Sequence, residues 1–114
     1  MELWELVARE SIRDTIAQYA YAGDRLMVEE MAAAFCADGV LETRRDHGTW
    51  VGRTAIIERL GGGRGVSTTQ VRAQARAERE PGERVVRRHV VTNICFQELT
   101  RDEARVVSYF TVLT

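Results

Sequence analysis

Residues 88–114 read RHVVTNICFQEL, then TRDE, then ARVVSYFTVLT. Two runs rich in β-branched and aromatic residues flank a short polar turn, which is the pattern of a long antiparallel hairpin. A tight turn places Asn93 opposite Phe110. The alternation of side chains then puts His89, Val91 and Asn93 on one face. Both faces are largely apolar, so we expect helices to cover one face and a partner subunit to cover the other.

The residues before this hairpin predict helices that pack against it. Ile12, Ile16 and Tyr19 recur at the spacing of one helix face, Gly23 ends that helix, and Asp24 is placed to cap the next. Helices followed by antiparallel strands favour an α+β fold. The predicted helices span 3–22, 25–35 and 54–60, the last capped by Thr54, and the predicted strands span 40–44, 49–51, 85–99 and 104–114.

The composition is that of one soluble globular domain over residues 1–114. With 45% hydrophobic and 29% charged residues, no apolar run of bilayer length and no signal-peptide pattern, we expect a cytoplasmic protein without membrane association. The net charge of −1 provides no global field for nucleic acid. All basic residues are arginines, which excludes Schiff-base chemistry on a lysine. Cys36 and Cys95 are expected to be free, buried thiols.

Several kinds of site lack their sequence signature. Residues 61–84 combine glycines, arginines and the single proline, and we expect a mobile loop whose arginines are either solvated or contact an anionic ligand. The glycines at 61–65 lack the Gly-Lys-Ser/Thr of a phosphate-binding loop, and no dinucleotide fingerprint is present, so no cofactor is expected. His47 and His89 have no ligand-spaced neighbours, so no metal site is expected either.

Four segments in order resemble motifs of the SnoaL-like proteins of the NTF2-like superfamily. They are QYAYAGD at 18–24, MAAAFCADGV at 31–40, GRTAI at 52–56 and RHVVTN at 88–93. The resemblance implies a cone in which N-terminal helices pack on a curved antiparallel sheet, as in scytalone dehydratase. Most relatives are homodimers, which implies a dimer through the outer sheet face. Members usually continue for another strand or two past the position of Thr114, which leaves a C-terminal truncation open.

The resemblance also implies a catalytic pair. Catalytic members use an acid after the first helix and a histidine on the sheet, and Asp24 and His89 match those positions. Tyr19, on the inward face of the first helix, is a candidate donor to a substrate oxygen. The structural alternatives are a helix cap for Asp24, a strand filler for His89 and a core residue for Tyr19.

Further residues are candidates for substrate binding. Asn93 can bind either substrate or a backbone group. Others are candidates for apolar lining of a pocket, with ordinary core packing as the alternative: Trp50, Met27, Met31, Phe35, Val91, Phe110 and Val112.

Together these features predict a cofactor-independent acid–base enzyme of the dehydratase, isomerase or cyclase type, acting on a small hydrophobic cyclic or polyketide-like molecule. The alternative is a non-catalytic small-molecule-binding or scaffold subunit, such as the small subunits of ring-hydroxylating dioxygenases, so catalysis itself is left open. An epoxide hydrolase would need inward aspartates on the long strands, and those strands offer none.

Overall fold

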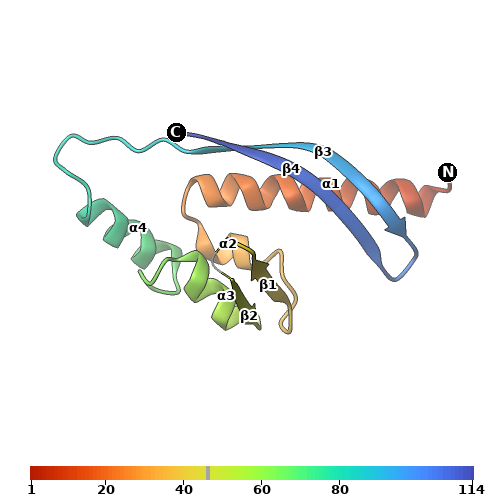
Figure 1. Cartoon of the computed structure of the whole chain (residues 1–114), viewed down its shortest axis with the longest axis horizontal. Coiled ribbons are helices and arrows are strands. Elements are labelled where there is room, and N and C mark those ends of the chain that lie inside the picture. The colour runs from red at the N-terminus through yellow and green to blue at the C-terminus, as the bar shows by residue number, and fades with distance from the viewer. Residues whose placement is uncertain (46) are drawn as a thin grey trace.

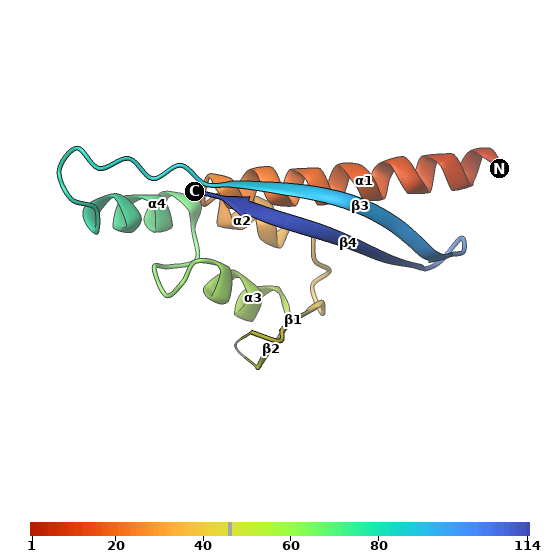
Figure 2. The same cartoon turned by 45° about the horizontal axis from the view of Figure 1, so that its top comes forward.

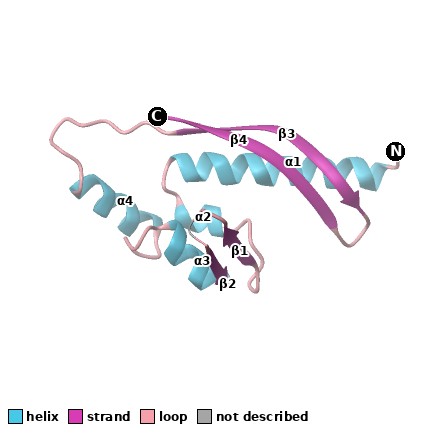
Figure 3. Cartoon of the chain, viewed as in Figure 1, coloured by secondary structure: helices cyan, strands magenta, loops and turns pink. Residues whose placement is uncertain are grey.

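The computed structural model describes residues 1–45 and 47–114 and has the expected α+β architecture (Figure 1). Within those residues the strands form two separate two-stranded antiparallel sheets, β1–β2 and β3–β4 (Figure 3). The predicted turn of the short hairpin includes residue 46, which lies outside the described residues. In chain order the elements are α1 (Leu3–Asp24), α2 (Val28–Ala32), β1 (Val40–Thr43), β2 (Gly48–Val51), α3 (Arg53–Leu60), α4 (Thr68–Ala77), β3 (Arg88–Leu99) and β4 (Ala104–Leu113).

Helix α1 and the β3–β4 hairpin lie side by side along the long axis of the molecule, as both views show (Figures 1 and 2). The guanidinium groups of Arg9 and Arg13 on α1 stack over the ring of Phe96 on β3, at 4.8 and 5.2 Å from its centroid. On β3, His89 and Val91 are less exposed than the alternating residues Arg88, Val90 and Thr92. Helix α1 therefore covers the face of β3 that carries His89, whereas Phe110 and Val112 of β4, on the same face, stay exposed.

A β-bulge at Asn93 changes the register expected for this hairpin. Val91, and not Asn93, pairs with Phe110, and the register shifts before Cys95. Asn93 has a φ of 56°, a left-handed conformation that asparagine tolerates better than most residues. The extra residue of a bulge reverses the alternation of faces beyond it. Phe96 consequently turns toward α1, and the expectation that Asn93 shares the face of His89 is wrong.

The two cysteines are free, but the expectation that they are buried is wrong, because both are exposed. Cys95 follows the bulge and is carried to the outer face of the hairpin. Cys36 lies in the turn after α2, where no element covers it.

The short helices form a second packed cluster beside α1. Its largest fully buried side chains are Val28 of α2, Ile56 of α3 and Val71 of α4. Helix α2 is shorter than the predicted 25–35 and begins only at Val28, with no side-chain cap. Helix α3 follows Gly52, whose φ of 88° suits glycine, so Thr54 lies inside the helix and the predicted cap by Thr54 is wrong.

Part of the segment 61–84 is a helix, which corrects the expectation of a loop throughout. Ser67 accepts a hydrogen bond from the backbone N–H of Gln70 and caps α4. The backbone N–H of Thr68 donates to Glu29 at 2.8 Å and ties the start of α4 to α2. Val71 and Ala75, one turn apart, supply its buried face. The arginines and glutamines around these two residues hide the apolar face in the sequence. The mobility of the segment stays a prediction.

A long-range contact joins α3 to the end of α2. The guanidinium of Arg53 donates two hydrogen bonds, at 3.1 and 2.6 Å, to the carbonyl oxygen of Phe35. We expect Arg53→Ala to lower the free energy of unfolding by about 1 kcal/mol, because that carbonyl loses both donors. Urea unfolding of the variant beside Arg45→Ala, which removes an exposed arginine from the short hairpin, measures the effect. Equal stability of the two variants would contradict the expected role of Arg53.

The outer face of the long hairpin is apolar and open. Tyr109 is 64% exposed and Leu113 56% exposed, beside the half-exposed Val90 and Val107. The radius of gyration is 15.8 Å, whereas a compact chain of this length has roughly 13 Å. The molecule is therefore elongated, and the outer face of the hairpin forms part of its surface. Among the described residues, none of the helices has both the length and the apolar character needed to cross a bilayer.

Candidate functional site

An apolar pocket lies between α1, the segment around the end of α2, β1 and the face of the β3–β4 hairpin that carries His89. Its volume is about 520 Å³, within the range of small-molecule sites. Six residues singled out from the sequence line it, namely Tyr19, Met31, Phe35, His89, Val91 and Phe110. Most of the remaining wall is also apolar, including Ile16, Ala20 and Leu41. The pocket therefore suits a hydrophobic guest with few polar groups.

Four of the candidate lining residues are absent from the wall of this pocket. Asn93 lies at the bulge and borders a shallow depression with Cys95 and Tyr109. Trp50 lies on β2 with the guanidinium of Arg59 at 4.9 Å from its ring. The other two lie near the pocket but outside its lining, Met27 just before α2 and Val112 opposite His89 on β4.

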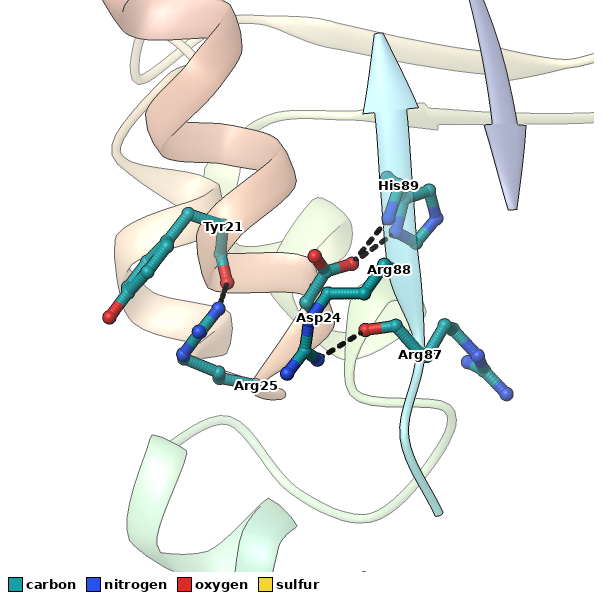
Figure 4. A network of polar contacts seen from close by, with 6 residues as sticks. All are labelled: Tyr21, Asp24, Arg25, Arg87, Arg88 and His89. Atoms are coloured by element: carbon teal, nitrogen blue, oxygen red, sulfur yellow. Dashed lines mark hydrogen bonds and ion pairs between the residues drawn. The ribbon is translucent and has the colours of Figure 1, made fainter. Parts of the chain in front are cut away.

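The structure brings Asp24 and His89 into direct contact (Figure 4). Nδ1 of His89 lies 2.6 Å from Oδ1 of Asp24, and the backbone N–H of His89 donates to the same oxygen at 2.9 Å. Asp24 is the last residue of α1, and His89 is the second residue of β3. The side chain of Asp24 is only 6% exposed, whereas that of His89 is 29% exposed.

The predicted cap by Asp24 is wrong. The residue before α2 is Met27, and α2 has no side-chain cap. Asp24 instead accepts both of its hydrogen bonds from His89, across 65 positions of sequence. A backbone bond and a ring bond to one oxygen hold the imidazole in a single orientation.

The charge state of Asp24 follows from its surroundings. Burial raises the pKa of its carboxyl, but the two hydrogen bonds from His89 and the charges of His89 and Arg88 outweigh burial and lower the pKa below its ordinary value. Asp24 is therefore ionised at neutral pH and can only accept hydrogen bonds. Nδ1 of His89 must be the donor in their contact. When the ring is neutral, the proton resides on Nδ1 and the lone pair on Nε2.

The aromatic rings near His89 complete the pocket. The ring of Phe110 lies 5.9 Å from the ring of His89, and Tyr19 meets Phe35 edge to face at 6.0 Å. Burial raises the pKa of Tyr19, which keeps its hydroxyl protonated and able to donate. Nε2 of His89 and the hydroxyl of Tyr19 form no hydrogen bond with residues 1–45 or 47–114. Both are available to a guest in the pocket.

Sequence reasoning did not propose three hydroxyl-bearing residues that line the pocket, namely Thr15 on α1, Thr43 on β1 and Ser108 on β4. The hydroxyl of Thr15 donates to the carbonyl oxygen of Ser11. Oγ1 of Thr43 is buried without a hydrogen-bond partner among the described residues. Strand alternation places Thr43 on the same face as Leu41, and Ser108 on the same face as Phe110. Strand alternation can therefore predict which hydroxyls line a pocket, but only when the side of each strand that faces the pocket is known.

No group of three or more histidine, cysteine, aspartate or glutamate side chains that could hold a metal ion occurs within the described ranges. The polar side chains of the pocket are an imidazole backed by a carboxylate, a phenol and three small hydroxyls. Such a set can move protons and can bind a carbonyl or hydroxyl oxygen.

Residues 4–114 match the sequence profile of a family described as SnoaL-like domain. Comparison with curated proteins and with solved structures found no significant match.

Proposed function

The chain belongs to the SnoaL-like family of the NTF2-like superfamily, and on that premise we propose that it is a cofactor-independent acid–base enzyme. Its substrate would be a small hydrophobic cyclic or polyketide-like ketone, and its reaction a dehydration, isomerisation or cyclisation. The observation that carries the proposal is the 2.6 Å contact of Asp24 with a histidine that lines an apolar pocket. A family of this kind hosts binding proteins as well as enzymes, so this contact is the argument for catalysis.

The first step assigned to the site is removal of a proton next to the carbonyl of the substrate. Nε2 of His89 takes the proton. The electron pair of the C–H bond forms the C=C bond of an enolate, and the π electrons of the carbonyl move to its oxygen. Ionised Asp24 stabilises the resulting imidazolium through Nδ1–H. The hydroxyl of Tyr19 is the proposed donor to the enolate oxygen, where the apolar walls make a hydrogen bond stronger than in water.

The second step distinguishes the three reaction types. In dehydration the enolate re-forms the carbonyl, a C=C bond forms, and the bond to a β-hydroxyl breaks as that oxygen takes the proton from His89 and leaves as water. In isomerisation the proton returns to another carbon. In cyclisation the enolate carbon attacks a second carbonyl of the same molecule, whose oxygen takes the proton. Each route returns His89 to its starting state without a cofactor.

Exchange of hydrogen for deuterium next to a carbonyl tests the shared first step. A panel of cyclic and linear hydrophobic ketones is incubated in D₂O with the protein, and the loss of α-proton signals is followed by NMR. We expect exchange for at least one hydrophobic ketone, at a rate proportional to protein concentration. Ketones that bind without any exchange would overturn the enzymatic proposal and leave the alternative of a binding or scaffold subunit.

The homodimer expected through the outer sheet face stays a prediction. Tyr109 and Leu113 lie uncovered on that face of the single chain, which is consistent with a second copy packing there. Light scattering after size exclusion measures the assembly, and a monomer at micromolar concentration would contradict the prediction.

A further inference from the structure

A second hollow, of about 270 Å³, is lined by five arginines. We call it the arginine hollow and define it by Arg25 after α1, Arg72 and Arg76 of α4, Arg79 just beyond α4, and Arg88 at the start of β3. Among residues 1–45 and 47–114, Asp24 is the single acidic residue that lines it. In Figure 4 the guanidinium groups of Arg25 and Arg88 lie below the carboxylate of Asp24, away from the ring of His89.

The guanidinium groups of α4 are not neutralised by the protein. The side chains of Arg72, Arg76 and Arg79 form no ion pair or hydrogen bond with any residue in the described part of the chain. They lie three and four positions apart on one helical stretch, where like charges repel one another. An anion placed between them would relieve this repulsion.

The other two arginines of the hollow form no ion pair within the described residues, although the charge of Arg88 is partly balanced by the nearby carboxylate of Asp24. Arg25 donates to the carbonyl oxygen of Tyr21 and stacks on its ring at 3.6 Å, and Arg88 donates to the carbonyl oxygen of Arg87. Neither contact supplies a negative charge. Asp24 directs its hydrogen-bonding oxygen to His89.

Of the three glutamates nearest to the hollow along the chain, Glu78 and Glu83 are engaged elsewhere, and Glu80 does not line the hollow. Glu78 pairs with Arg64 at 3.0 Å, and Glu83 accepts a hydrogen bond from the backbone N–H of Glu80 at 2.9 Å. Both glutamates line a neighbouring depression, which shares Arg79 and Asp24 with the arginine hollow, but neither glutamate lines the hollow itself. The local excess of positive charge therefore stays on the hollow.

We propose that the arginine hollow binds a phosphate group. Guanidinium forks match the oxygens of a tetrahedral oxyanion and can hold it with paired hydrogen bonds. Arginines reach the hollow from three separate stretches of chain, so they can surround such a group and not merely face it. Leu26, Val85 and Val86 form the apolar part of the wall, and Val85 and Val86 are themselves about half exposed. The proposal does not depend on the ketone chemistry of the apolar pocket.

Calorimetric titration of the full chain at constant ionic strength tests this site. Inorganic phosphate is compared with chloride, and wild type with Arg72→Gln/Arg76→Gln, which keeps good helix formers on α4. We expect saturable phosphate binding to wild type and a dissociation constant at least tenfold higher in the variant. The matched control is Arg44→Gln/Arg45→Gln, which removes the same charge from an exposed part of the short hairpin and should leave binding unchanged.

The outcomes separate a site from a general effect of charge. Equal weakening in the two double variants, or absence of saturable binding to wild type, would overturn the proposal. Arg79→Gln, outside α4, gives a second test if the first variant unfolds, and it should also weaken phosphate binding. Phenyl phosphate distinguishes the two sources of the phosphate group, a phosphate ester and free phosphate. Tighter binding than inorganic phosphate assigns the site to a phosphate ester with an apolar part, and equal binding assigns it to free phosphate.

Discussion

Replacing His89 by glutamine is expected to slow α-proton exchange of a responsive ketone by about 10²–10⁴-fold. Glutamine keeps a polar side chain of similar reach but has no basic nitrogen at neutral pH. The other contacts of the pocket remain, so ketone binding should change far less than the exchange rate. NMR in D₂O measures the exchange, and a binding titration with the same ketone measures affinity.

His47→Gln is the matched control for this experiment. His47 is the other histidine of the chain, and it is exposed in the turn of the short hairpin. Its replacement should leave the exchange rate unchanged. If His89→Gln retained the exchange rate of wild type, the base would be another group, and the assignment of the proton transfer to His89 would fail.

Asp24→Asn is expected to lower the free energy of unfolding by about 1.5–3 kcal/mol at neutral pH, the usual range for hydrogen bonds to a charged group. Asparagine keeps the shape of the side chain but lacks the negative charge of the carboxylate that accepts hydrogen bonds from the ring and backbone of His89. Because that carboxylate is almost fully buried in the folded chain, solvent screens these bonds little.

The difference between wild type and Asp24→Asn should depend on pH in one direction. The pKa of Asp24 is lowered on folding, so its contribution is complete above the unfolded value of about 3.9 and disappears as pH falls through the lower folded value. Urea unfolding at about pH 7 and about pH 3 measures this change. An unchanged difference at the two pH values would contradict the charged contact. Asp14→Asn, which alters an exposed carboxylate of α1, should change stability by less than about 0.5 kcal/mol.

The sequence predicts the elements around the site well, for local reasons. The apolar spacing of α1 and the strand-forming runs of β3 and β4 depend on residues near one another in the chain. Strong patterns of this kind predict an element without knowledge of its neighbours. The pairing of Asp24 with His89 came from the resemblance to a family, because no local pattern links a helix end to a strand 65 positions later.

Features that depend on tertiary contacts were not predictable in the same way. The bulge at Asn93 is one extra residue in a strand, and the alternation of the sequence continues through it without a break. Helix α4 lies in a stretch dominated by arginines, and it buries only Val71 and Ala75 against the rest of the chain. The capping role expected for Asp24 failed because His89, distant in the sequence, is a competing donor that sequence spacing does not reveal.

The most direct test of the acid–base account is the position of the proton on the ring of His89. The ¹⁵N chemical shifts of its two nitrogens, recorded at mildly alkaline pH with and without a bound ketone, distinguish the two neutral forms of the ring. We predict a proton on Nδ1, directed to Asp24, and an unprotonated Nε2 whose shift responds to the ketone. A neutral ring with its proton on Nε2, or an Nε2 shift that ignores the ketone, would contradict the proposed base.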